Sequence, residues 1–380
     1  MTLPAAPIFF AQHTSKGRAH DRLSAVAEAR SKQSKAPPGL LLDFGAVHLR
    51  GVEEDKTKAG KLAPILPSGS AYEIASKWKV PMASWVQRAA PTTKAEWNAT
   101  VKESLKKQRE LDVDALVVPG AELEAGDYPK GLEDQIDAIR RAWAERPDND
   151  PPWLAEFCLH DDWIKNQNAC RLVLNLLTDL PDAIGIALRI RFAKRDAAGD
   201  APVLGRLRFV VGALADDGRK VLLIQSGIVG WLSLAWGAWG FSAGMSQESW
   251  LYHRTVIRRR SGQPSPPRVE RYFERQLLHP VLSADHGRLA NATGYTQCGC
   301  SFCNSLAQGG AWDHNASAQH SLYALASLTE AAAGADRAAR RDAVRATIES
   351  AQNLWAQWRG TAGLSGQATP AGLSVWRGLV

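Results

Sequence analysis

Residues 220–244 read KVLLIQSGIVGWLSLAWGAWGFSAG. Two short apolar runs, 220–225 and 238–243, flank an apolar helical pattern at 228–236, and the pairs Ser-Gly and Gly-Ala mark turns between them. Strands that are covered on both faces form continuous apolar runs, whereas half-exposed strands alternate apolar and polar residues. The run from Val221 to Ile224 is continuous. The stretch therefore predicts a strand–helix–strand unit of a parallel sheet.

The same rhythm of strands and helices extends back to the N-terminus. The expected strands are residues 7–12, 39–47, 80–87, 115–119, 153–160, 183–192, 220–225 and 238–243. The expected helices are residues 19–35, 71–78, 93–111, 131–144, 161–180, 201–215 and 228–236. Eight such units predict an α/β fold, a (β/α)8 TIM barrel over residues 1–257, with function at the carboxyl ends of the strands. An open doubly wound sheet is the alternative, but no Gly-x-Gly-x-x-Gly follows the first strand to mark a dinucleotide site.

The pattern changes after Gly244. Residues 258–268 are rich in Arg, Pro, Ser and Gly and are expected to form a loop. Residues 269–317 look irregular, and residues 318–358 are Ala-rich and helical with a break at Gly334. We expect residues 258–380 to form a zinc-binding subdomain with C-terminal helices packed on the barrel.

The composition suits a soluble globular protein. Hydrophobic residues make up 45% and charged residues 22% of the 380 residues. No apolar run reaches the roughly 20 residues that cross a bilayer, and no basic region followed by an apolar stretch marks a secretory signal. The expectation is a cytoplasmic enzyme without a membrane partner. The oligomeric state stays open, a homodimer included.

The chain is basic, with a formal net charge of +7 and a pI near 9.2. This charge permits an anionic partner such as nucleic acid or a phosphate ester. Part of the excess lies in the run Arg258, Arg259 and Arg260. These arginines either contact nucleic-acid phosphates or belong to a solvated loop.

Cysteines point to a metal site. Three of the five, Cys298, Cys300 and Cys303, fall within six residues, which suits a metal site in a reducing compartment better than a disulfide framework. With one histidine they would give a closed tetrahedral Cys3His shell around a structural Zn²⁺. His320, at the expected start of a helix, is the preferred fourth ligand, and His314 competes with it. Three buried thiols without a metal are the alternative.

The order of these features resembles the tRNA-guanine transglycosylase superfamily, the queuine and archaeosine tRNA-ribosyltransferases, including its DNA-modifying 7-deazaguanine branch. That family combines a (β/α)8 barrel with Cys-x-Cys-x-x-Cys and a later histidine at the head of a helix. The matching residues are Cys298, Cys300, Cys303 and His320, and the sequence His-Ser-Leu-Tyr is similar to the family's His-Asn-Leu-Tyr. The family places its histidine several residues further from the last cysteine.

The resemblance also suggests catalytic positions. Asp43, in Leu-Leu-Asp-Phe-Gly, looks like the family's general-base aspartate at the end of an early strand. The family's nucleophilic aspartate corresponds here to Ser242, and its base-recognising aspartate is replaced within residues 117–120. A carboxylate beside the glycosidic bond stabilises an oxocarbenium-like centre, which serine does poorly without a base. Asp43 could instead cap the next segment or pair with a barrel arginine, and Ser242 could simply let a ligand approach closely.

Other polar residues end the expected strands. Arg189 and Arg191 share one face of their strand, so they are expected to meet Asp43 or a substrate phosphate. Backbone N–H groups at the strand ends could hold a phosphate, the residues concerned being Gln225, Ser226, Gly227 and Gly244. His160-Asp161-Asp162 offers an acid or base, but we expect Asp161 or Asp162 to cap the helix that follows.

Three functions compete. The first is exchange or recognition of guanine or a 7-deazapurine base in tRNA or DNA. The second is a nucleic-acid-binding accessory module that has lost the nucleophile, which Ser242 favours. The third is an unrelated barrel enzyme acting on a small phosphorylated substrate.

Overall fold

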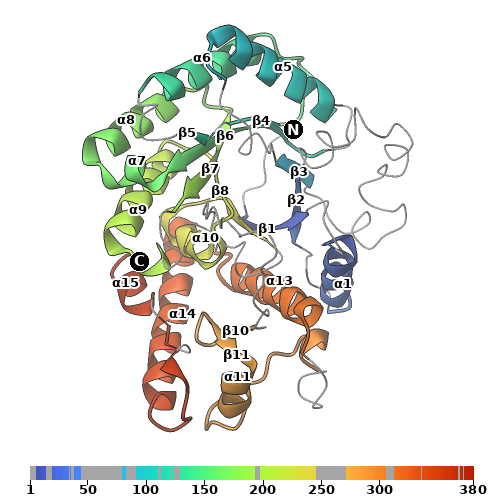
Figure 1. Ribbon diagram of the computed structural model, residues 1–380, viewed down its shortest axis with the longest axis vertical. Coiled ribbons are helices and arrows are strands. Elements are labelled where there is room, and N and C mark those ends of the chain that lie inside the picture. The colour runs from blue at the N-terminus through green and yellow to red at the C-terminus, as the bar shows by residue number, and fades with distance from the viewer. Residues whose placement is uncertain are drawn as a thin grey trace, which may run out of the picture.

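Parallel strands and the helices between them form the larger part of the molecule in the computed structural model (Figure 1). All eight strands expected from the sequence are present. Their bounds are β1 Ile8–His13, β2 Gly39–Asp43, β3 Lys79–Met82, β4 Leu116–Val118, β6 Trp153–His160, β7 Gly185–Arg191, β8 Val221–Ile224 and β9 Gly240–Ala243. A short strand that was not expected, β5 (Glu122–Leu123), pairs with β6.

The structure describes residues 6–13, 19–33, 35, 38–43, 79–82, 91–109, 113–120, 122–123, 129–192, 197–244, 271–304, 312–334, 336–366, 369–370 and 372–380. Within these ranges, helices that are both long and apolar enough to cross a membrane are absent.

The sheet is curled, so that its first strand along the chain, β1, pairs with its last, β9. Its order is β3-β2-β1-β9-β8-β7-β6-β4, with β5 beside β6, and every pair in it is parallel. Cα atoms of the end strands β3 and β4 come within 8 Å of each other. No hydrogen-bonded pairing joins these two strands among the described residues, so the part described is a curled parallel sheet and not the closed barrel that the sequence predicted.

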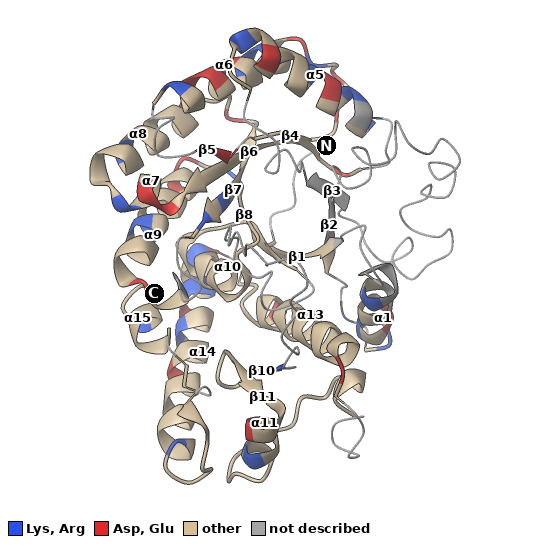
Figure 2. Cartoon of the chain, in the orientation of Figure 1, with Lys and Arg blue, Asp and Glu red and all other residues tan. Residues whose placement is uncertain are grey.

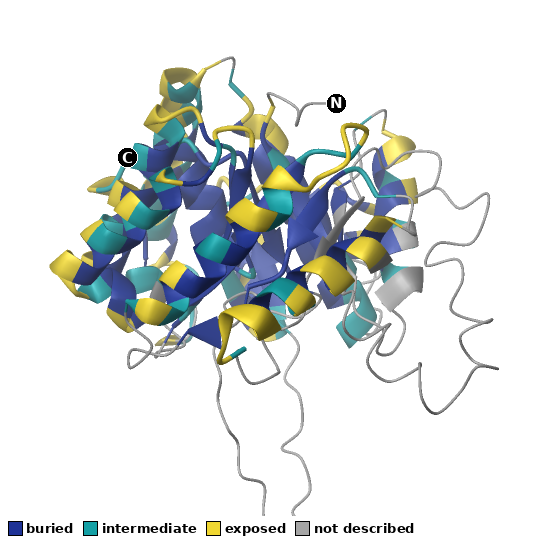
Figure 3. Cartoon of the chain, turned by 90° about the horizontal axis from the view of Figure 1, so that it is seen from above, coloured by how far each residue is buried: buried dark blue, intermediate teal, exposed yellow. Residues whose placement is uncertain are grey.

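Both faces of the strands β1, β4 and β6 to β9 are largely buried, as the continuous apolar runs predicted (Figure 3). One face packs against the helices. The inner face holds a separate cluster that includes Phe10, Leu154, Ala187 and Leu222. Because side chains alternate along a strand, the next inner positions toward the carboxyl ends are residues 12, 156, 189, 224 and 242. Four of these five are polar and buried, namely Gln12, Glu156, Arg189 and Ser242. The inner face thus changes from apolar to polar toward the carboxyl ends of the strands.

Helices surround the outer face of the sheet (Figure 1). Their bounds are α1 Ala19–Ser31, α5 Lys94–Arg109, α6 Lys130–Ala144, α7 Asp161–Lys165, α8 Gln167–Thr178, η3 Ala197–Gly199, α9 Ala201–Asp216, α10 Gly227–Ser233 and η4 Leu234–Trp236. The single helix expected over 161–180 divides at Asn166, whose side chain accepts hydrogen bonds from the N–H groups of Asn168 and Ala169 and begins α8. The helix expected over 71–78 lies outside the described residues.

The C-terminal part contains more regular structure than expected. The irregular stretch expected over 269–317 is wrong in part, since it holds an antiparallel hairpin and a helix. The elements are β10 Arg271–Glu274, β11 His279–Leu282, α11 Ser283–Ala290, η6 Ser301–Cys303, α13 His314–Ala331, α14 Arg337–Trp358 and α15 Leu373–Arg377. Helix α13 packs against α1, β1 and α10, and α14 packs against η4. These contacts join the C-terminal elements to the sheet.

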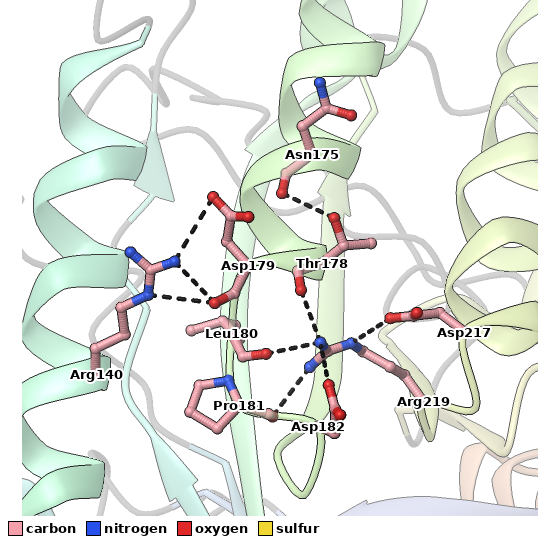
Figure 4. Close-up of polar contacts among 9 residues, drawn as sticks. All are labelled: Arg140, Asn175, Thr178, Asp179, Leu180, Pro181, Asp182, Asp217 and Arg219. Atoms are coloured by element: carbon pink, nitrogen blue, oxygen red, sulfur yellow. Dashed lines mark hydrogen bonds and ion pairs between the residues drawn. The ribbon is translucent and has the colours of Figure 1, made fainter.

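A buried arginine fastens the connections at the amino ends of the strands (Figure 4). Arg219, just before β8, has a side chain that is 1% exposed. Its guanidinium donates to the carbonyl oxygens of Thr178, Leu180 and Pro181 at 2.8, 2.7 and 3.0 Å, and pairs with Asp217 at 2.9 Å. The segment after α8 is thereby held against the segment after α9.

Candidate metal centre and strand-end site

Three cysteines and one histidine meet in a buried cluster. The Sγ atoms of Cys300 and Cys303 lie 3.3 Å apart, and His320 Nδ1 lies 3.4 and 3.3 Å from them. Cys298 completes the group, in which one ligand atom from each residue lies within 4.8 Å of all the others. All four residues are buried. The cluster can hold a metal ion such as zinc.

Local structure brings the ligands together. Cys300 and Cys303 flank the single turn η6, in which the Cys303 N–H donates to the Cys300 carbonyl at 3.2 Å. His320 comes from α13, nearly two turns after its first residue, His314. The expectation that His320 begins the helix is therefore wrong, because α13 starts six residues earlier under the N-cap Asp313. His320, and not His314, belongs to the cluster.

A backbone carbonyl orients the histidine. His320 Nε2 lies 2.9 Å from the carbonyl oxygen of Phe273 on β10. A carbonyl can only accept, so Nε2 carries a proton, which leaves Nδ1, beside the sulfur atoms, as the ring nitrogen that can ligate a metal. Metal-ligating histidines commonly donate their second ring N–H in this way. The hairpin β10–β11 thus prepares His320 to bind a metal.

Tyr272 adds an outer contact that the sequence did not indicate. Its ring stacks between those of His286 and His320, with centroid distances of 3.7 and 4.1 Å. Its hydroxyl lies 3.3 Å from Cys303 Sγ, and burial raises the pKa of this phenol, so its O–H is available to donate to a metal-bound sulfur. The two hairpin strands are only four residues long, so the sequence carries no pattern that predicts the contact of Tyr272 with the cluster.

The electrostatics of the three thiols favour a bound cation. Hydrogen bonds from Cys300 and Cys303 lower the pKa of Cys298, which favours its thiolate. The hydrogen bond with Cys298 then raises the pKa of Cys300, because a second buried thiolate would lie against the first. A metal ion removes this conflict, since it holds all three sulfurs as thiolates. The donor set, the burial and the oriented histidine therefore fit a closed metal shell.

At the strand ends, Ser242 is a fully buried hydrogen-bonding centre. Its Oγ accepts from the Gln225 N–H at 2.8 Å and from Gln12 Nε2 at 3.4 Å, and its carbonyl accepts from the Ser226 N–H at 2.9 Å. Gln225 has a φ of 50°, a left-handed conformation that is strained for a residue with a side chain. These contacts link β1, β8 and β9. The N–H groups of Gln225 and Ser226, which we expected to hold a phosphate, are engaged by Ser242.

Close packing also accounts for the residues after β8. Ser226 Oγ donates to the Leu223 carbonyl at 2.9 Å. Gly227 has a φ of 48°, and a Cβ at Gly230 would lie 2.2 Å from Ser226 Oγ. Only glycine at position 230 lets α10 lie this close to β9. Gly244 follows β9 directly and is buried.

The two strand arginines pair with glutamates that the sequence analysis did not single out. Arg189 lies 2.7 Å from Glu156 on β6, and both side chains are less than 5% exposed. Arg191 pairs with Glu122 on β5. Cys158 lies between these pairs on β6, and burial raises the pKa of its thiol, which keeps it unreactive. Both arginines thus lie on β7, and their glutamates lie on β6 and β5; Figure 2 shows the basic residues on β7 and an acidic residue on β5.

The helix cap after β6 differs from the expectation. His160 itself is the N-cap of α7, since its Nδ1 accepts from the Asp162 N–H at 3.2 Å. Asp161 pairs with Lys165 at 2.8 Å, one turn along the same helix. The expected cap by Asp161 or Asp162 is therefore wrong.

Two of the predicted sites, one aspartate and one run of three arginines, have no described side chains. Asp43 ends β2, but its side chain lies outside the described residues, and so do Arg258, Arg259 and Arg260.

No protein-family model matches this chain, and a search of curated proteins finds no match.

Proposed function

We propose that this chain has the fold of the tRNA-guanine transglycosylases and acts on guanine or a 7-deazaguanine in tRNA or DNA. The observation that carries the proposal is the strand order β3-β2-β1-β9-β8-β7-β6-β4. This is the order that eight consecutive strands of a barrel would have if the barrel were open between its third strand, β3, and its fourth, β4. The Cα atoms of these two strands approach within 8 Å. We take the sheet to close there.

Zinc is the proposed metal. Three thiolates and one imidazole form a tetrahedral shell that zinc favours, and four protein ligands leave no position for a water nucleophile. Such an ion would be structural, tying the loop that carries the cysteines to α13 and, through Phe273, to the hairpin.

The inner face supplies groups that suit a purine. Guanine offers donors and acceptors along its edges, which arginine and carboxylate side chains complement. The pair Arg191 and Glu122 lies near the carboxyl ends of the strands and is slightly exposed. Asp43 ends β2, two residues after the inner-face residue Leu41. At that position a carboxylate would stabilise the positive charge of a glycosidic transition state and handle protons.

A specific observation favours the accessory module as a second candidate. Strand β9 contains no carboxylate, and Ser242 on it is fully buried with its hydroxyl engaged by Gln225 and Gln12. Recognition of the base without exchange would need no nucleophile. The third reading, a small phosphorylated substrate, receives little support, since Arg189 and Arg191 are paired with glutamates.

Exchange of radiolabelled guanine and a labelled 7-deazaguanine into tRNA and into duplex DNA tests the proposal. The wild-type protein should incorporate label, and Asp43→Asn should lower the rate by about 10²–10⁴-fold while it still folds and binds nucleic acid. Asp148→Asn, a matched change at an exposed aspartate, should leave the rate unchanged.

Nucleic-acid binding without exchange by the wild type would favour the accessory module. Neither binding nor exchange would contradict both candidates.

A further inference from the structure

A hollow lies beside η4, at the amino end of β9 and away from the strand-end residues described above. It has a volume of about 340 Å³ and is lined by Arg208, Ala235, Trp236, Arg337, Ala338, Arg341 and Leu379. Arg208 comes from α9, and Arg337 and Arg341 come from α14. The 3-10 turn η4 supplies Ala235 and Trp236 and precedes β9. We call this hollow the arginine pocket.

Positive charge exceeds negative charge around the arginine pocket. Arg337 pairs with Asp216, and Arg341 lies 3.8 Å from Asp342. Within the part of the chain that the structure describes, no carboxylate lies within ion-pair distance of Arg208. Three guanidinium groups therefore share two carboxylates at the rim, both more than half exposed.

Two further cations, Arg340 and Lys220, lie outside the lining and are coupled to it electrostatically through Arg337. The Nε of Arg340 is buried and has no hydrogen-bond partner among the described residues. Burial and the neighbouring Arg337 lower the pKa of Arg340, and burial and Arg340 lower the pKa of Lys220. A cation whose pKa is lowered by a neighbouring cation is stabilised by a bound anion.

The remaining lining suits a phosphate group. The Nε1–H of Trp236 donates to the Leu379 carbonyl at 3.0 Å and is therefore already engaged. The Trp236 ring thus offers apolar surface to a ligand, and the arginines offer the hydrogen-bond donors. Guanidinium groups match phosphate oxygens in pairs.

We propose that the arginine pocket binds the phosphate group of a nucleotide or of a nucleic-acid backbone. The site lies at the opposite end of the strands from the proposed chemistry and does not depend on it. Phosphate bound there would contact two arginines from α14 and one from α9, and would fasten these helices together.

Calorimetric titration with pyrophosphate at low salt tests the proposal. The wild type should bind, and the double variant Arg208→Ala/Arg341→Ala should bind about tenfold more weakly or less. Arg345→Ala is the matched control, because Arg345 lies one turn further along α14 and is also close to Asp342, at 3.5 Å. It should change the affinity by no more than about twofold.

Arg208→Gln, a single change at an exposed position, should weaken binding as well and guards against misfolding of the double variant. Titration with a single-stranded oligonucleotide identifies the source of the phosphate. If the double variant lowers the slope of log affinity against log salt by about 0.7–1.4, the backbone of nucleic acid occupies the pocket, and if only pyrophosphate responds, the ligand is a free phosphate ester. Absence of pyrophosphate binding by the wild type, or an equal loss in Arg345→Ala, would overturn the proposal.

Discussion

Tyr272 touches the metal cluster without belonging to it. Its hydroxyl lies 3.3 Å from Cys303 Sγ, and its ring stacks on His320. Tyr272→Phe keeps the stacking and removes the donor to the sulfur. We expect metal affinity to fall by about 10–100-fold, the usual effect of removing an outer hydrogen bond from a metal ligand. Competition with a chromophoric chelator measures it.

Tyr295→Phe is the control for this prediction. Tyr295 lies in the same aromatic group, but its hydroxyl is 3.4 Å from His286 Nδ1. Its removal should leave metal affinity nearly unchanged. Equal losses in the two variants would show that general packing, and not the contact to sulfur, sets the affinity.

The sequence predicts residues well where the chemistry is local. Cys298, Cys300 and Cys303 were recognisable because short spacing lets thiolates share one ion. Tyr272 was not, because 31 residues separate it from Cys303. For the same reason Arg189 was identifiable as a buried cation, but its partner Glu156 was not: the partner comes from the neighbouring strand, and pairing depends on strand register.

Among the elements, the loops before β7 and β8 depend on Arg219. Its guanidinium holds three carbonyl oxygens with a side chain that is 1% exposed. Arg219→Ala should lower the free energy of unfolding by about 3 kcal/mol, because buried carbonyls lose a charged donor. Urea denaturation followed by circular dichroism measures the change.

Arg140→Ala is the matched change on α6. Arg140 donates to the Asp179 carbonyl at 2.8 Å, but its side chain is 43% exposed, so its loss should cost less than about 1 kcal/mol. Similar losses for both variants would contradict the account of Arg219.

Elements were predictable in proportion to their length and apolar continuity. Most of the eight expected strands carry continuous apolar runs, and turn signals mark their ends. The hairpin β10–β11 was missed because each of its strands has only four residues. In addition, β10 has a charged residue at each end, so it shows no apolar run. The division at Asn166 was missed because an apolar helical pattern runs through it, and only the side-chain cap interrupts the helix.

For the whole molecule, the metal cluster connects the C-terminal elements to the sheet. Helix α13 carries His320 and packs against α1, β1 and α10. Removal of the metal should therefore destabilise more than the loop that carries the cysteines. A strong chelator should lower the Tm by about 5 °C or more, since 1 kcal/mol moves the Tm of a large domain by about 2–4 °C. Zinc added after removal of the chelator should restore the Tm. An unchanged Tm after proven loss of metal would contradict this role.

The sequence predicts a parallel sheet built from successive strand–helix units, but it does not determine whether that sheet closes into a barrel. Strand–helix repeats predict a parallel sheet and its right-handed connections. Closure depends on how β3 meets β4, and these strands are joined through a segment that includes residues outside the described ranges. Sequence periodicity carries no information on that contact.

X-ray absorption spectroscopy at the zinc edge of the purified protein tests the central claim most directly, because it reports the ligands of the metal itself. We predict a zinc edge with three sulfur ligands at about 2.3 Å and one nitrogen ligand at about 2.0–2.1 Å. In His320→Ala the nitrogen at that distance should be replaced or lost. A first shell made only of nitrogen and oxygen, or the absence of zinc from the purified protein, would contradict a Cys3His centre at Cys298, Cys300, Cys303 and His320.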